Sequence, residues 1–191
     1  MILASQSAAR AAVLRAAGLT FEQRPARIDE AAIKDAMRDG PPEDCALTLA
    51  GMKAARIRDP AQLVIGADQL LVCEGAWFDK PADRDAARAQ LRALRGRTHT
   101  LITAVVCYRG GAEIWRHVAR PSLRMRAFSD GFLEHYLDAE GDGILGSVGA
   151  YRLEGPGVQL FDRVDGEHAA VLGLPLLPLL GFLRQCGVLA A

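Results

Sequence analysis

The 191-residue sequence has no excess of either charge, because its 23 lysines and arginines are balanced by 23 aspartates and glutamates. Without a strong field of one sign, nothing favours nucleic acid or a membrane surface as a partner. The longest apolar stretch, residues 169–183, contains two prolines and predicts a terminal core helix and not a membrane span. A signal-peptide pattern is also missing, so we expect a cytoplasmic protein.

The sequence also lacks the common cysteine and glycine motifs. Its four cysteines form no CxxC pair, which excludes the usual zinc sites and disulfide frameworks. Cys73 and Cys107 lie in apolar runs and are expected to be buried free thiols. No glycine-rich P-loop or dinucleotide fingerprint is present, which argues against a phosphate-binding transferase on a related scaffold.

Half of the residues are hydrophobic, which is enough for a substantial core, and residues 1–191 are predicted to form one domain with an α/β fold. The tripeptide Arg109-Gly110-Gly111 predicts a hairpin, which would bring antiparallel pairing into the sheet. The glycine-rich stretch 141–157 is expected to be a functional loop. Strands are predicted at residues 1–3, 21–24, 63–73, 98–108, 113–125 and 158–161, and helices at residues 7–17, 43–56, 83–94, 130–139 and 174–185.

One carboxylate interrupts the apolar run at residues 63–73. Asp68 follows Gly66 and Ala67, which leave room beside it for a ligand or another backbone. A carboxylate is expensive to bury unless something pairs with it. Asp68 is therefore a metal ligand or general base, or else a salt-bridged core residue or part of a strand-end turn.

The start of the chain has the pattern of an anion site. A short apolar strand runs into a turn with Ser5 and Ser7, either of which is a natural N-cap for a helix that Gly18 closes. The free N–H groups and the dipole at a helix N-terminus favour a phosphate, and Arg10 would add a forked donor. The same pattern also fits an ordinary capped helix with a surface arginine.

Eight short motifs stand in an order that resembles the Maf family of nucleoside triphosphate pyrophosphatases, over nearly the whole chain. They are Leu-Ala-Ser-x-Ser at 3–7, Ile-Asp-Glu at 28–30, Leu-Ala-x-x-Lys-Ala at 49–54, Ile-Gly-Ala-Asp at 65–68, Lys-Pro at 80–81, Gly-Arg-Thr-His at 96–99, Gly-Ala-Tyr at 149–151 and Leu-Gly-Leu-Pro at 172–175. The resemblance implies an elongated mixed sheet flanked by helices, two lobes with a central cleft, and a homodimer.

The resemblance also implies a reaction, in which water attacks the α-phosphorus of a nucleoside triphosphate and pyrophosphate leaves. Such a reaction needs the phosphates to be held and the developing charge to be neutralised, which a divalent cation (Mg²⁺, Mn²⁺ or Co²⁺) on one or two carboxylates supplies. Asp68 is the candidate base, and Glu30 is the candidate second carboxylate for the metal. The candidate triphosphate ligands are Ser5, Ser7, Arg10, Lys53 and Lys80.

Several of these residues also have purely structural interpretations. Glu30 fits a solvated helix cap, and Lys53 fits a helix surface. Lys80 precedes a proline, so it is extended or in a turn, where most lysines are simply solvated. His99 is expected to support or line the cleft and not to act as the catalyst.

The sequence departs from the commoner family pattern at positions that bear on the substrate. One arginine is absent at Ala9, a lysine is replaced by Ser147, and the residue after Asp68 is Gln69 where threonine is common. Glu154 replaces a base-facing glutamine. Gln69 and Glu154 resemble the branch associated with 7-methyl-GTP, although that branch has a bulky aromatic residue where this chain has Ala9.

Glu154 has a chemical rationale as a base reader. A carboxylate accepts from guanine N1–H and the exocyclic N2–H₂ together, whereas a glutamine suits a pyrimidine better. The other interpretation is a solvated loop glutamate. For the whole chain, the alternative to a nucleotide-pool hydrolase is a nucleotide-binding regulator of cell division with weak or lost catalysis.

Overall fold

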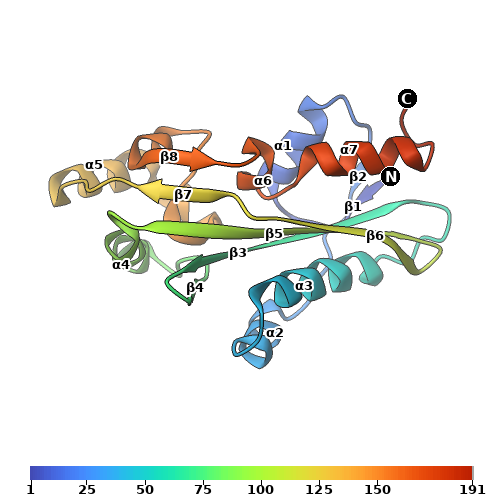
Figure 1. The fold of residues 1–191 in the computed structure, drawn as a ribbon, viewed down its shortest axis with the longest axis horizontal. Coiled ribbons are helices and arrows are strands. Elements are labelled where there is room, and N and C mark those ends of the chain that lie inside the picture. Colours follow the sequence, from blue (N-terminus) through green and yellow to red (C-terminus); the bar gives the residue numbers. More distant parts are fainter. Residues whose placement is uncertain (191) are drawn as a thin grey trace. The chain divides into compact units, whose positions relative to one another are not determined.

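The computed structural model describes residues 1–190 and has an α/β architecture (Figure 1). Within these residues, eight strands form one mixed sheet in the order β2-β1-β3-β5-β7-β8, with β4 paired to β3 and β6 paired to β5. The strands are β1 (Ile2–Leu3), β2 (Glu22–Gln23), β3 (Val64–Cys73), β4 (Ala76–Phe78), β5 (Thr98–Arg109), β6 (Ala112–Ala119), β7 (Ser122–Met125) and β8 (Phe161–Asp165). The predicted fold class is confirmed.

Helices flank this sheet and follow the predicted segments within a few residues, apart from two short additions, α2 and α6. The α-helices are α1 (Ala8–Ala16), α2 (Glu30–Met37), α3 (Pro42–Arg56), α4 (Arg84–Leu94), α5 (Asp130–Glu140), α6 (His168–Val171) and α7 (Leu176–Gln185). Short 3-10 helices are η1 (Gly141–Gly146), η2 (Val148–Ala150) and η3 (Pro156–Leu160). Asp29 begins α2 as its N-cap, accepting from the Ala32 N–H at 3.1 Å.

The chain divides into two compact units. Unit 1 contains residues 1–69, residues 102–119 and the segment from Glu167 onward. Unit 2 contains residues 70–101 and 120–166. The last residue of the predicted 1–191 domain, Ala191, lies outside the described residues.

In unit 1, α1 and α7 cover one face of the strands and α3 covers the other (Figure 1). Side chains alternate along a strand. Ile65 and Ala67 therefore belong to the core beneath α1 and α7, whereas Val64 belongs to the core beneath α3. The same alternation directs the side chain of Asp68 towards α3.

Gly66 allows α3 to pack directly on the backbone of β3. A Cβ atom at Gly66 would lie 2.0 Å from the Ala50 carbonyl oxygen and 2.9 Å from the Ala54 backbone nitrogen. No side chain fits into that space, because both neighbours are backbone atoms of α3. Of the two occupants predicted beside Asp68, a ligand or another backbone, the structure shows a backbone next to Gly66.

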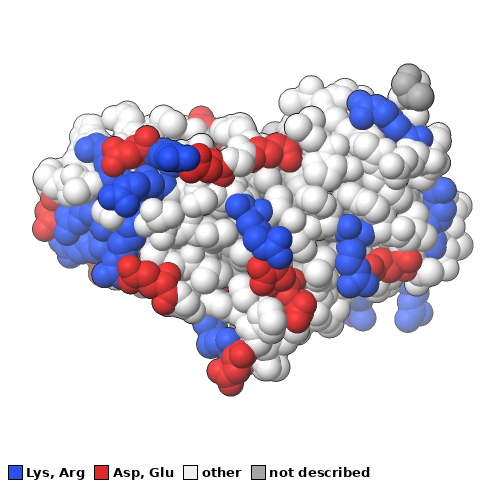
Figure 2. All heavy atoms as spheres, viewed as in Figure 1, with Lys and Arg blue, Asp and Glu red and all other residues white. Residues whose placement is uncertain are grey.

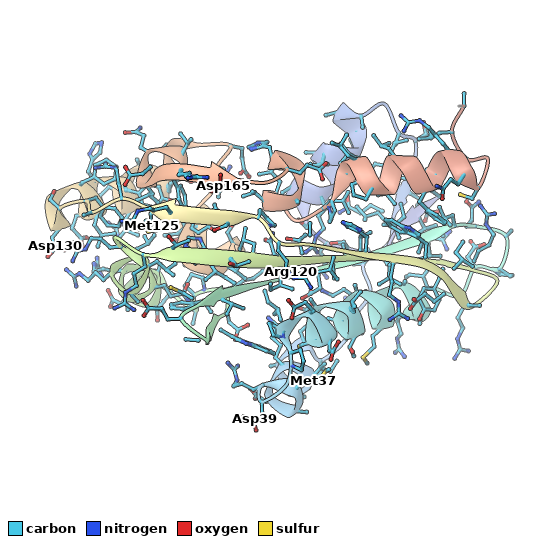
Figure 3. The ribbon with its side chains drawn as sticks, viewed as in Figure 1. Met37, Asp39, Arg120, Met125, Asp130 and Asp165 are labelled. Carbon is cyan, nitrogen blue, oxygen red and sulfur yellow. The ribbon has the colours of Figure 1, made fainter. Side chains whose placement is uncertain are left out.

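In unit 2, surface ion pairs join α4 to α5. Arg88 Nε lies 2.6 Å from Glu134 Oε1, and Arg95 Nη1 lies 2.8 Å from Asp130 Oδ1. Figure 2 shows basic and acidic side chains interspersed at this end of unit 2, and Figure 3 labels Asp130 at the start of α5. Exposed pairs of this kind contribute little to stability, so the packing of these helices depends mainly on buried residues such as Leu91 and Leu133.

Two predicted strands are wrong in their limits. The strand predicted at residues 113–125 is two strands, β6 and β7, because Arg120 (labelled in Figure 3) and Pro121 separate them. Proline has no N–H for a sheet ladder. The strand predicted at residues 158–161 begins only at Phe161, and the residues before it form η3.

The apolar C-terminal stretch and the cysteines follow their predictions. Leu179, Phe182 and Leu183 of α7 are buried in the core of unit 1, as expected of a core helix. None of the helices within residues 1–190 combines the length and apolar character that crossing a bilayer requires. Cys73 and Cys107 are buried free thiols, and burial raises the pKa of Cys107 to about 12.

The contact between Gly66 and α3 predicts a large effect of adding one methyl group. Gly66→Ala should lower the free energy of unfolding by about 3 kcal/mol or more, because the new Cβ meets backbone atoms that cannot move aside. Urea unfolding measures this change. Gly51→Ala is the control, because its Cβ would meet only the Tyr108 hydroxyl at 3.6 Å. Equal stabilities of the two variants would contradict the close packing.

Candidate functional site

Asp68 lies in the middle of β3 and is buried, with 4% of its surface exposed. Its Oδ1 atom accepts a hydrogen bond from Lys53 Nζ at 2.6 Å. Its Oδ2 atom is also buried but has no hydrogen-bond partner within the described residues. A buried carboxylate oxygen without a donor is costly, so this oxygen is suited to take a proton, a water or a cation.

Lys53 links Asp68 to a second carboxylate. It lies on the face of α3 that packs on β3 and is 7% exposed. Besides Asp68, its Nζ contacts Glu30 Oε1 at 2.8 Å. Burying an ammonium requires such paired anions. The alternative interpretation of Lys53 as a helix-surface residue is therefore wrong. The interpretation of Asp68 as a salt-bridged residue is correct for its Oδ1 atom.

The turn before α1 is organised around Arg10. Ser7 is the N-cap and its Oγ accepts from the Arg10 N–H at 3.3 Å, while Gly18 follows the helix with a φ of +75°. Arg10 Nη1 donates to Ser5 Oγ at 3.2 Å, and Arg10 Nε donates to the Gly173 carbonyl at 2.8 Å. Both helix-end predictions are confirmed, and the arginine is held from two sides.

Arg10 shares its electrostatic environment with the two carboxylates. Burial lowers the pKa of Arg10, and the charges of Asp68 and Glu30 oppose that shift. Two cations and two carboxylates of unit 1 therefore act on one another. Of the predicted site residues, unit 1 contains Ser5, Ser7, Ala9, Arg10, Glu30, Lys53, Asp68 and Gln69.

Gln69 points to the opposite face of β3 from Asp68. Its Nε2 atom lies 2.9 Å from Thr103 Oγ1 and 3.0 and 3.1 Å from the carbonyls of Ala170 and Val171. The amide nitrogen is thus used within the protein. Gln69 would therefore contact a ligand through the carbonyl oxygen of its side chain.

Lys80 and Glu154, the other two predicted site residues, belong to unit 2. Lys80 is exposed, and the carbonyl of the preceding Asp79 is fixed by Gln90 Nε2 at 2.8 Å. Glu154 has a side chain that is 40% exposed, and its Oε1 lies 3.7 Å from Arg152 Nε. Glu154 is therefore a solvent-accessible carboxylate with a charged neighbour.

His99 is a buried residue of unit 2. Its Nε2 lies 2.8 Å from the Tyr151 hydroxyl, and its ring contacts those of Tyr151 and Phe161. Burial lowers the pKa of His99 to about 4 and raises that of Tyr151. The imidazole is therefore neutral and structural at neutral pH, in agreement with the supporting role predicted for it.

Asp68 and Glu30 are the two carboxylates predicted to hold a metal, and both contact Lys53. Within residues 1–190, no group of three or more His, Cys, Asp or Glu side chains is arranged to hold a metal ion. Magnesium characteristically takes only one or two carboxylates and completes its shell with water and substrate phosphates. Asp68, with its unpartnered Oδ2, and Glu30 fit that kind of site.

The sequence patterns did not indicate two residues that hold or contact the predicted site residues. The Gly173 carbonyl holds Arg10, and Arg152 contacts Glu154. The Leu-Gly-Leu-Pro motif at 172–175 was a signal for the first, although no side chain there suggests a role. A basic residue two positions before Glu154 was the only signal for the second.

Known proteins resemble this chain along its whole length. The family model for Maf-like protein matches residues 1–186. A nucleoside triphosphate pyrophosphatase of Granulibacter bethesdensis is 56% identical over 97% of this chain and 96% of its own length. Relatives with the same name in Paramagnetospirillum magneticum and Gluconobacter oxydans are 51% and 50% identical, over 98% and 100% of this chain and 99% and 97% of their own lengths.

The buried imidazole predicts a pH dependence of stability. The pKa of His99 is about 4 when folded and about 6.5 in an unfolded chain, so between these values only the unfolded state takes up the proton. Stability is therefore lost as the pH falls. From pH 7 to pH 5 the free energy of unfolding should drop by about 2 kcal/mol more in the wild type than in His99→Gln.

Urea unfolding at the two pH values measures this difference. Glutamine can still accept from Tyr151, so the variant should fold at pH 7. His135→Gln, which changes an exposed histidine of α5, should keep the wild-type pH dependence. The same pH dependence in His99→Gln and the wild type would assign the titration to another group.

Proposed function

The chain belongs to the Maf-like protein family and is a nucleoside triphosphate pyrophosphatase, and on that premise we propose that Asp68 is its catalytic base. The observation that carries the proposal is the buried Oδ2 of Asp68, which has no partner, beside an Oδ1 that Lys53 holds in place. One oxygen fixes the carboxylate and the other is left for the reacting water.

The proposed reaction is an in-line hydrolysis at the α-phosphorus. A water molecule donates a proton towards Asp68 Oδ2 and forms a bond to the α-phosphorus, while the bond from that phosphorus to the bridging oxygen of the β-phosphate breaks. The products are the nucleoside monophosphate and pyrophosphate. Lys53 holds the Asp68 carboxylate in place through its Oδ1 atom, so the base is oriented before substrate arrives.

The phosphate chain is proposed to lie against the turn that precedes α1. Arg10 carries its charge there, and its guanidinium is pre-oriented by Ser5 and Gly173. Ser7 caps the helix, whose N-terminus adds favourable dipoles for an anion. Lys80 of unit 2 is proposed as a further phosphate ligand, because it is an exposed cation at a fixed turn.

A divalent cation, Mg²⁺, Mn²⁺ or Co²⁺, is proposed to bind through Glu30 and Asp68, whose Oδ2 would then face both the cation and the reacting water. When bound, it would neutralise phosphate charge as it develops. Lys53 contacts both carboxylates, so it keeps them close together and balances part of their repulsion. Only two protein carboxylates are involved, which leaves coordination positions for water and phosphate oxygens.

Glu154 is proposed to read the base, with guanine-type nucleotides, including 7-methylated ones, preferred over dTTP and UTP. Its exposed carboxylate can accept two neighbouring guanine donors. Gln69 and Ala9 remain proposed specificity residues, Gln69 through its carbonyl oxygen. The alternative of a cell-division regulator without catalysis is not favoured, because the Glu30–Lys53–Asp68 cluster is complete.

We also propose that the enzyme keeps the cytoplasmic nucleotide pool clean and works as a homodimer. The substrate of a nucleoside triphosphate pyrophosphatase is in that pool. The balanced charge of the chain gives no reason to expect a nucleic acid partner.

The role of Asp68 predicts the effect of an isosteric change. Asp68→Asn should lower pyrophosphate release on the order of a hundredfold or more, because the base is lost while the shape remains. The measurement is a pyrophosphate assay with Mg²⁺, Mn²⁺ or Co²⁺. Asp29→Asn, next to Glu30, is the control, since asparagine also caps helices well. A folded Asp68→Asn protein with near wild-type turnover would remove Asp68 from the mechanism.

The role of Glu154 predicts a change in base choice. The wild type should favour GTP or 7-methyl-GTP over UTP and dTTP, and Glu154→Gln should shift the ratio of kcat/KM values towards the pyrimidines by roughly tenfold to a hundredfold. Competition assays measure that ratio. Asp142→Asn removes another exposed carboxylate from the same loop and should leave the ratio unchanged. A wild type that prefers UTP or dTTP would refute base reading by Glu154.

A further inference from the structure

The glycine-rich segment 141–157 is built around one arginine. A Cβ at Gly143 would lie 2.7 Å from Arg152 Nη1, and one at Gly157 would lie 2.4 Å from the Arg152 carbonyl oxygen. A Cβ at Gly155 would lie 2.8 Å from Oε1 of Glu140, the partner of Arg152. These three glycines leave the space that the Arg152–Glu140 pair occupies.

Glu140 is a buried carboxylate that the proposed reaction does not use. It is the last residue of α5, and only 3% of its side chain is exposed. Its Oε2 lies 3.5 Å from Arg152 Nη1, whereas its Oε1 is buried without a hydrogen-bond partner in the described part of the chain. Burying a carboxylate is costly unless a cation pairs with it. Arg152 is the cation that Glu140 faces.

Arg152 connects this buried carboxylate to the exposed one. Its Nη1 faces Glu140, and its Nε lies 3.7 Å from Glu154 Oε1. The three charges sum to one negative charge, so Glu140 compensates the arginine and leaves the charge of Glu154 available to a ligand. Without that compensation, Arg152 would be a stronger partner for Glu154 and would compete with any donor that approaches it.

The backbone before Arg152 is also fixed. Ala150 has a φ of +58°, which is strained for a residue with a Cβ, and its carbonyl accepts from the Tyr136 hydroxyl at 3.2 Å. The next residue, Tyr151, is tied to His99. Such strain persists only where the surroundings determine the conformation. The arginine therefore starts from a rigid backbone position.

We propose that Glu140 and Arg152 are positioning residues that orient the Glu154 carboxylate towards the nucleobase and thereby set base selectivity. This proposal rests on the proposed reading of the base by Glu154. A long side chain on an open loop loses selectivity when it samples many rotamers, because ordering it costs entropy on binding. Arg152 Nε lies at an ion-pair distance of 3.7 Å from Oε1, which biases the direction of the carboxylate, and each carboxylate oxygen still has a lone pair for a guanine donor.

The test is a double-mutant cycle on base selectivity. Glu140→Gln keeps the shape of the side chain and removes its charge, so the ratio of kcat/KM for GTP to that for UTP should fall by roughly threefold to tenfold. The kcat for UTP should stay close to its wild-type value. In the Glu154→Gln background, Glu140→Gln should cause no further change, because Glu140 acts through Glu154.

Two further variants separate positioning from stability. Glu134→Gln removes another α5 carboxylate, one that pairs with Arg88, and should leave the ratio unchanged. Arg152→Lys keeps the charge but loses the planar fork, so it should lower the ratio as well, and it replaces Glu140→Gln if that variant does not fold. A merely structural role would instead lower kcat for all nucleotides alike.

The outcomes separate this proposal from the one on which it rests. If Glu154→Gln shifts the ratio but neither Glu140→Gln nor Arg152→Lys does, the positioning role is refuted and base reading by Glu154 stands. If Glu154→Gln leaves the ratio unchanged, base reading fails, and the positioning role fails with it. Equal effects of Glu140→Gln in the wild-type and Glu154→Gln backgrounds would also refute the positioning role.

Discussion

The buried ion pair between Lys53 and Asp68 is the interaction on which the site of unit 1 depends. A carboxylate in the middle of a buried strand needs a cation close by, and here the cation comes from α3. It reaches Asp68 because Gly66 lets α3 lie against the backbone of β3. The packing of the core and the geometry of the candidate active site are thus consequences of one close contact.

Arg10, the second cation of unit 1, is also fixed by the fold before a ligand arrives. Arg10 is anchored by Ser5 on its own turn and by the Gly173 carbonyl, 163 residues further along the chain. Preorganised charges of this kind favour phosphoryl chemistry, because little reorganisation is needed when charge develops in the reaction. The carboxylates Asp68 and Glu30 offset part of the cost of burying the arginine.

Unit 2 contains a similar arrangement with a different purpose. Arg152 lies between Glu140 and Glu154 as Lys53 lies between Glu30 and Asp68. In both clusters one carboxylate is deeply buried and the other is partly exposed. In unit 1 the buried carboxylate, Asp68, is proposed to act on the substrate. In unit 2 the partly exposed carboxylate, Glu154, is proposed to contact the base.

The sequence by itself determined the α/β class, most helices, a serine N-cap at Ser5 or Ser7 before the first helix, and the burial of Asp68, because local periodicity and capping chemistry depend on neighbouring residues. The family motifs also indicated the candidate site residues, such as Asp68, Lys80 and Glu30. Only the tertiary structure decided that Lys53 is buried, that the Gln69 amide contacts Thr103, and that Glu140 lies beside Arg152. These contacts join segments far apart in the chain, and their geometry depends on how strands and helices pack, which no local pattern encodes.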